Sequence, residues 1–368
     1  MATISSKPNA IVLGSDVQQP GIRVAPLLDH ERYRSAKPLL ADSELFGRLS
    51  AVFQAVPTIL VEEGHRGKHL MEVVINGDLI RAKGGESFRA WAVDGNGKIA
   101  EHATLFEPEK LQQMVNAAAI WQIASLVVAQ KHLADISAKL DEIREGVQDI
   151  RRFLDEERRG QVLGTMKYLK QVTTTISKGD LSPAIRNQLE NCERELLQIQ
   201  EHLQQELLHQ SSESIEHKEW FGTKDLQMET VTKYERLQNL AKDIRLTLKT
   251  RVLAWYVLSL YPGEVALKKA RMEELLHSAE ELKACLQSIE KRAEQDCEQL
   301  SSWLNRDTTL AIRRTEVREA AMALSNDLLA INNDTRESVQ LSNDMLSSPT
   351  HLVFEVEDGR ISELRLVG

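Results

Sequence analysis

The chain has 368 residues, of which 42% are hydrophobic, 27% charged and 5% aromatic, and its net charge is −9. This length allows two or more domains, and the acidic balance argues against a general nucleic-acid binder, because phosphate contacts dominate the affinity of such proteins. The three cysteines, Cys192, Cys285 and Cys297, are too scattered for a metal site and indicate reduced thiols in a cytoplasmic protein.

Proline positions divide the sequence into parts. Six of the nine prolines lie at or before Pro108, whereas between residues 109 and 348 only Pro183 and Pro262 occur. Helices tolerate proline poorly beyond their first turn. We therefore expect a small mixed α/β region over 1–107, a long-helix coiled-coil bundle over 108–346, and a C-terminal β-hairpin over 350–368.

The first part carries turn signals between short β-type segments. A short helix is predicted over 36–56 and β structure over 70–106, with turns at Asn76-Gly77 and Asp94–Gly97. A further hairpin is predicted over 352–367 around Asp358-Gly359. Whether these hairpins share one sheet is left open by the sequence.

The most regular pattern is an apolar seam with alternating steps of three and four residues. Such spacing keeps one narrow stripe of a helix against a partner helix. The helix should run from Pro108 to about residue 159, where Gly160 and Gly164 either break it or let it continue to Ile176. At about 1.5 Å per residue, such a helix is too long for a compact globule. The seam residues are Leu133, Ile136, Leu140, Ile143, Val147, Ile150 and Leu154.

Four more helices are predicted in the remainder of the bundle. The second begins at Ser182-Pro183, and the third runs from residue 224 to Tyr261. The fourth carries a stripe of apolar residues from Leu275 to Leu300. The fifth follows residues 305–308, and its helical pattern weakens over 335–342. The fold class is therefore mainly α: an elongated long-helix bundle or coiled coil with a small α/β or β region from the N-terminal part, to which the C-terminal hairpin is a candidate addition.

The sequence contains no strong match to a known catalytic or metal-binding motif. His65 and His69 have a spacing that could bind zinc on a helix, but they lie in a glycine-rich basic stretch that favours a solvated loop or an anion contact. The stretch Asp94–Ile99 resembles the middle of a calcium loop whose end ligands are absent. No phosphate loop or nucleophile elbow is found. We expect no enzyme activity, cofactor, metal or small-molecule substrate, and an enzyme site around His65, His69 and Arg89 is the least favoured reading.

Two segments, 117–128 and 252–261, are apolar around the whole helix circumference. Such a segment lies either in a protein core or against lipid. If they lie in the core, both segments are surrounded by other helices and by the sheet. If they contact lipid, they form a membrane-inserting element that is hidden until the conformation changes. The candidates for lipid contact are Ile120, Trp121, Leu126, Val127, Trp255, Tyr256, Leu258 and Tyr261.

The segment from Pro108 to Arg159 resembles a pattern found in uncharacterised bacterial helical or coiled-coil proteins. It is carried by Leu133-Ala-Asp-Ile136, Leu140-Asp-Glu-Ile143 and Phe153-Leu-Asp-Glu-Glu-Arg-Arg159, and it implies no site residues. The architecture is also loosely similar to that of α-helical pore-forming toxins.

We expect a non-catalytic helical interaction or scaffold protein of the bacterial cytoplasm, acting through coiled-coil self-association or by binding another helical protein. The alternative is a membrane-inserting α-helical pore-forming or membrane-remodelling protein. No membrane-spanning segment and no secretory signal are expected, because no apolar run is long enough and the first nine residues lack a signal's pattern.

Overall fold

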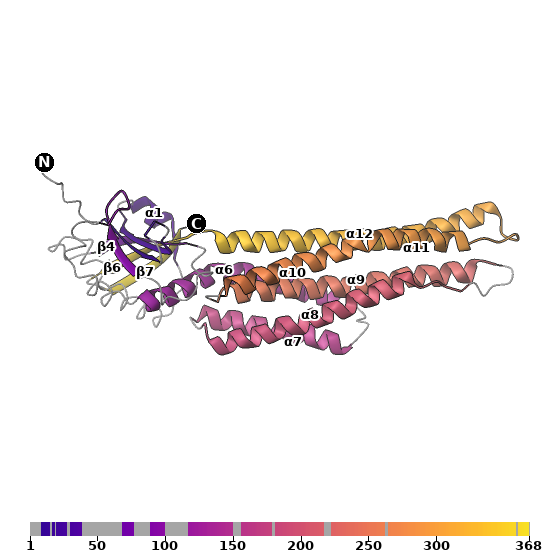
Figure 1. Ribbon diagram of the computed structural model, residues 1–368, viewed down its shortest axis with the longest axis horizontal. Helices are drawn as coiled ribbons and strands as arrows, with labels where there is room; N and C mark the ends of the chain where they lie inside the picture. Colours follow the sequence, from indigo (N-terminus) through magenta and orange to yellow (C-terminus); the bar gives the residue numbers. More distant parts are fainter. Residues whose placement is uncertain are drawn as a thin grey trace.

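The computed structural model describes residues 9–14, 17–18, 20–27, 30–38, 68–76, 89–99, 117–149, 156–178, 181–216, 222–261, 264–357 and 360–367. These residues form an elongated helical bundle with a small antiparallel sheet at one end (Figure 1). The first and last described strands, Ala10–Gly14 and Arg360–Val367, both belong to this sheet. The mainly helical fold class expected from the sequence is confirmed.

One seven-stranded sheet unites strands from both ends of the chain, in the order β3-β7-β6-β4-β2-β1-β5. The C-terminal hairpin enters its middle, because β6 pairs with β4 from Lys68↔Glu357 to Ile75↔Thr350. This joins the hairpin that the sequence left unplaced to the N-terminal strands. The strands are β1 (Ala10–Gly14), β2 (Ile22–Pro26), β3 (Lys37–Pro38), β4 (Lys68–Ile75), β5 (Arg89–Val93), β6 (Thr350–Glu357) and β7 (Arg360–Val367).

The two faces of the sheet differ in polarity. Met71 and Val73 of β4 are buried opposite Phe354 and Leu352 of β6, so alternate residues form an apolar face. The opposite face carries the short helix α1 (His30–Ser35), whose Tyr33 hydroxyl donates to the carboxylates of Glu355 and Glu363.

The sequence predicted some of these strands and missed others. β4, β5 and the C-terminal hairpin are where β structure was expected, and the Asp94–Gly97 turn forms, with Gly97 at φ 77°. The strands β1 and β2 were not predicted. The helix expected over 36–56 is wrong at its start, where Lys37–Pro38 pair with β7 as β3, and its remainder lies outside the described residues.

The long first helix of the prediction is two helices. They are α6 (Ala117–Asp149) and α7 (Glu156–Ser177). They run antiparallel, because Gln130, close to the middle of α6, donates to the carbonyl oxygen of Ser177 at the end of α7 at 3.5 Å, so α7 has returned along α6. The chain therefore reverses between Asp149 and Glu156. At about 1.5 Å per residue, α6 is about 50 Å long rather than the longer rod that one continuous helix would give.

Gly160 and Gly164 do not break the helix but lie inside α7. A Cβ atom added at either position would meet no atom within 4 Å. We expect Gly160→Ala and Gly164→Ala each to raise the free energy of unfolding by about 0.5–1 kcal/mol, because alanine loses less conformational entropy in a helix. Urea unfolding measures this. The matched control Gly97→Ala should instead destabilise by about 1–2 kcal/mol, since its φ is positive; destabilisation by the α7 variants would contradict a continuous α7.

The remaining helices follow the prediction with two changes. The fourth predicted helix is interrupted at Cys285. The fifth shows no break over 335–342 and continues to Ser347, with Thr335 and Ser342 buried at seam positions. Ser182 caps its helix by accepting from the Ala184 amide at 3.2 Å. The helices are α8 (Pro183–Ser212), α9 (Lys224–Ser259), α10 (Val265–Ala284), α11 (Leu286–Gln299) and α12 (Asp307–Ser347).

Helix α9 is the centre of the bundle. It contacts α6, α7, α8, α10 and α12 (Figure 1), and every residue from Thr250 to Ser259 is buried. A helix surrounded on all sides must be apolar around its circumference. This accounts for the composition of the 252–261 segment.

Candidate functional site

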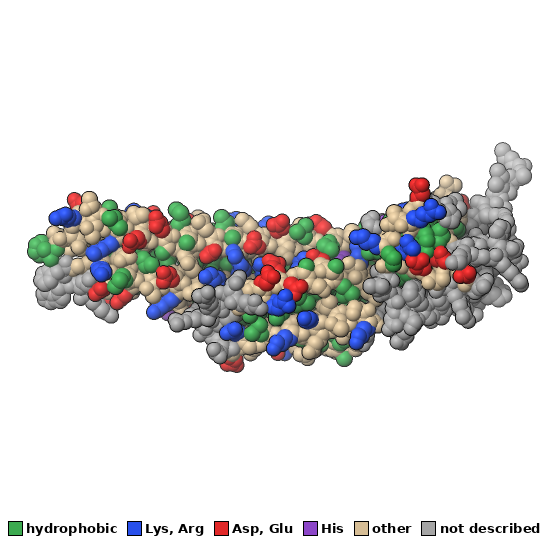
Figure 2. All heavy atoms as spheres, turned by 180° about the vertical axis from the view of Figure 1, so that it is seen from behind, with side chains coloured by type: hydrophobic (Ala, Val, Ile, Leu, Met, Phe, Trp, Pro, Cys, Tyr) green, Lys and Arg blue, Asp and Glu red, His purple; other side chains and the backbone are tan. Residues whose placement is uncertain are grey.

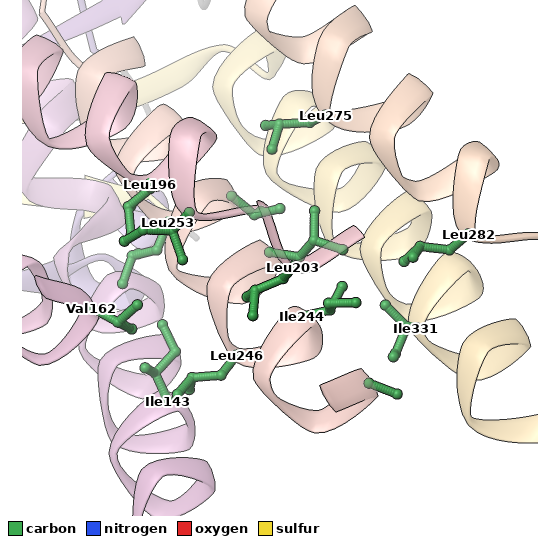
Figure 3. Packing of buried hydrophobic residues seen from close by; sticks show 14 of the residues in the cluster. Ile143, Val162, Leu196, Leu203, Ile244, Leu246, Leu253, Leu275, Leu282 and Ile331 are labelled. Carbon is green, nitrogen blue, oxygen red and sulfur yellow. The ribbon is translucent and has the colours of Figure 1, made fainter. Parts of the chain in front are cut away.

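The seam predicted on α6 faces the interior of its own chain. Ile136, Leu140, Ile143 and Val147 are buried, and Leu133 packs partly buried against the same core. Figure 3 shows Ile143 lying beside Leu246 of α9 and near Val162 of α7. Ile150 and Leu154 lie outside the residues whose side chains the structure describes. The described part of the seam therefore pairs helices within the chain.

The two apolar segments also lie in the core where their side chains are described. Val127, Trp255, Tyr256, Leu258 and Tyr261 are all buried. Ile120, Trp121 and Leu126 belong to α6, but their side chains fall outside the described set. Among the described residues, no helix is both long enough and apolar enough to cross a bilayer.

A half-open groove of about 360 Å³ lies between α6, α9 and α12. Its apolar lining comes from Ile143, Val252, Ile331 and Leu341, and of these Leu341 keeps 54% of its surface exposed. The lining spans residues 331–341 of α12, which is about 15 Å along the helix axis. The other eight lining residues are polar or charged. Because Ile143, Val252 and Ile331 are buried, Leu341 supplies the exposed apolar surface of the groove.

Charges of both signs surround the apolar lining. Lys249 of α9 pairs with Glu142 of α6 at 2.5 Å, and Arg245 of α9 lies 4.0 Å from Asp334 of α12. Lys139 of α6 also lines the groove and pairs with Asp135 at 2.7 Å. The same mixture of blue and red side chains extends along the bundle (Figure 2). These pairs are partly exposed, so each contributes little to stability, but together they set a charge pattern that a partner must match.

Arg245 is incompletely satisfied. Its Nε atom is buried and has no hydrogen-bond partner among the described residues. A buried donor left unpaired costs about 1–3 kcal/mol. Because this Nε is enclosed, a carboxylate from outside would meet only the exposed part of the Arg245 side chain, which keeps 35% of its surface.

A second polar cluster lies deeper in the bundle and joins three helices. Arg251 of α9 is fully buried and donates to Glu193 of α8 at 2.9 Å, to Gln200 of α8 at 2.5 Å and to Glu274 of α10. Burial raises the pKa of the Glu193 carboxyl to about 7, against the opposing pull of Arg251. Because these groups are enclosed, the cluster fixes how α8, α9 and α10 fit together and offers little to a substrate.

The residues proposed for an enzyme site are not brought together by the described structure. His65 lies outside the described residues, and His69 and Arg89 lie on β4 and β5 with side chains that are not described. Within the described part of the chain, no three His, Cys, Asp or Glu side chains are placed to hold a metal ion. The Asp94 loop is a turn in which the Asp94 carboxylate accepts from the amides of Asn96 and Lys98.

No protein-family model, curated protein or solved structure matches the chain. The resemblance of 108–159 to bacterial helical proteins therefore stays a prediction, and the site must be argued from its geometry.

The groove was not foreseen in the sequence. Lys139 and Glu142 flank the predicted seam, where charged residues are usual in a coiled coil. Their role depends on Arg245, Lys249 and Asp334, which are about a hundred or more residues distant in the sequence. The available signal was that α9 carries Arg245 and Lys249 at i, i+4 beside a stretch that is otherwise strongly apolar.

Proposed function

We propose that this protein is a non-catalytic helical interaction or scaffold protein of the bacterial cytoplasm, and that it binds a helix of a partner protein in the groove between α6, α9 and α12. The observation that carries this proposal is the exposed Leu341 side chain in a groove between three helices, with rim charges of both signs around it. An amphipathic helix laid in such a groove would bury its apolar face and leave its polar flanks at the rim.

A helix suits the groove better than a small molecule. Small-molecule sites hold their ligand with convergent, precisely placed polar groups inside a concave pocket. Here the rim charges are already paired with each other, as in Lys249–Glu142, and the exposed side of Leu341 offers apolar area. The expected partner helix has apolar residues at i, i+3 or i+4, flanked by both acidic and basic residues, with a carboxylate near Arg245.

Affinity capture from the native lysate with matched variants tests the proposal. Leu341→Asp should abolish capture of the partner, because it places a charge on the apolar lining. The control Met322→Asp lies on the same helix, is 64% exposed and is not part of the groove, so it should capture the partner as the wild type does. Both substitutions are at exposed positions, and we expect both proteins to fold.

The outcomes separate the alternatives. Loss of the partner with Leu341→Asp alone supports the groove, whereas equal capture by all three proteins would contradict it. If light scattering shows a dimer that Leu341→Asp dissociates, the partner is a second copy rather than another protein. Dye release from liposomes by the wild type, with no protein captured, would favour the membrane-inserting alternative and overturn the scaffold proposal.

A further inference from the structure

His132 of α6 is fully buried at the junction of α6, α9 and α12. Its Nδ1 atom lies 2.7 Å from the hydroxyl oxygen of Tyr256 on α9, and the two rings meet edge to face with centroids 5.5 Å apart. The same hydroxyl lies 3.9 Å from the sulfur of Met345 on α12. The His132 imidazole therefore lies between α6 and α9, and Tyr256 links it to α12, the third helix of the groove.

The site suits a neutral imidazole and not a charged one. The second ring nitrogen, Nε2, is buried and has no hydrogen-bond partner among the described residues. On α6 the neighbouring charged groups are Lys131, Asp135 and Lys139; the Lys139 ammonium stands over the Tyr256 ring at 5.7 Å and pairs with Asp135 at 2.7 Å. Tyr256 is the titratable group from α9, and Met345 of α12 is uncharged.

These surroundings lower the pKa of His132. Burial is the largest cause, and the charge of Lys131 adds to it, while Asp135 opposes both; the resulting pKa is about 4. Asp135 compensates little because Lys139 already neutralises it. In the protonated ring both nitrogens carry a hydrogen, so Nε2–H would be an unpaired donor on a buried cation, which is strongly unfavourable.

We propose that His132 is an acid-sensitive latch: as a neutral side chain it holds α6 against α9 and α12, and protonation releases α6 from this junction. Release would uncover the buried apolar face of α6 that includes Val127, Val128 and Ala129. The latch is independent of the proposed partner, because it depends only on contacts within the chain.

The direction of the effect follows from the lowered pKa. An exposed histidine titrates near 6.5, so the open form takes up a proton before the closed form does. The closed junction is therefore fully favoured above about pH 6.5 and loses stability as the pH falls towards 4. Linkage predicts that the opening equilibrium rises about twenty-fold between pH 7 and pH 5, and by roughly 300-fold below pH 4.

Hydrogen exchange of the full chain tests the latch, with rates corrected for the intrinsic effect of pH. In the wild type, peptides from 124–147 should lose protection about twenty-fold between pH 7 and pH 5 relative to peptides from 183–212. His132→Gln, which cannot acquire the charge, should show no such loss. His277→Gln is the matched control, since His277 is 73% exposed, and it should behave as the wild type does.

A second measurement keeps the proposal open to refutation even if His132→Gln does not fold. In a histidine-edited NMR titration of the wild type, the chemical shifts of the His132 ring should remain those of a neutral imidazole down to about pH 5. Titration of folded His132 near pH 6.5 would overturn the proposal. So would an equal pH-dependent loss of protection in the wild type and in folded His132→Gln.

Discussion

Replacing Arg251 by methionine should lower the free energy of unfolding by about 3–5 kcal/mol, because it leaves the Glu193 carboxylate buried without its partner. The loss relative to the wild type should grow as the pH rises above about 7, because the pKa of Glu193 is about 7 in the wild type and removal of Arg251 raises that pKa further. Without Arg251, folding must keep Glu193 protonated, whereas the carboxyl of the unfolded chain ionises near its ordinary pKa of 4.5. Urea unfolding at several pH values measures both effects.

Two variants show whether the loss comes from the unpaired charge. Arg251→Met combined with Glu193→Leu should recover most of the stability, because an apolar replacement of a buried pair is often neutral or better. Arg271→Met removes a partly exposed pair with Glu190 and should cost about 0–1 kcal/mol. A loss for Arg251→Met as small as that for Arg271→Met would show that Glu193 has access to water.

Truncating Ile143 to alanine should cost about 2–5 kcal/mol, because this side chain is buried between α6, α7 and α9. The loss should not depend on protein concentration, since the seam pairs helices within one chain. Leu341→Ala, at the exposed groove, should change stability by about 0.5 kcal/mol or less. Unfolding midpoints measured over a hundred-fold range of concentration test this. A wild-type midpoint that rises with concentration, with the rise lost in Ile143→Ala but kept in Leu341→Ala, would mean that the seam joins two chains.

The helical architecture could be predicted because its signals are local. Steps of three and four residues placed Ile136, Leu140 and Ile143 on one stripe, and Ser182-Pro183 marked a helix start that the structure confirms. The reversal between α6 and α7 could not be predicted in this way. The seam continues through Ile150 and Leu154, and residues 147–154 contain no proline or glycine, so local spacing gave no sign that α6 ends at Asp149.

The polar features of the bundle depend on contacts that local spacing does not encode. Arg251 follows Ile244 and Leu248 at helical spacing and so falls on a buried stripe, a conflict that could have marked it as a paired charge. Its partners Glu193 and Glu274 come from two other helices, and no sequence rule selects them. The groove and the His132 junction are likewise assembled from three helices.

Photo-cross-linking from the groove in living cells tests the central claim most directly. A photoreactive phenylalanine analogue at position 341 should give a cross-link that mass spectrometry maps to a helical segment of a partner protein, and the analogue at position 322 should give none. Cross-links from position 322 and none from position 341, or from neither position, would contradict the proposal that the groove between α6, α9 and α12 binds a partner helix.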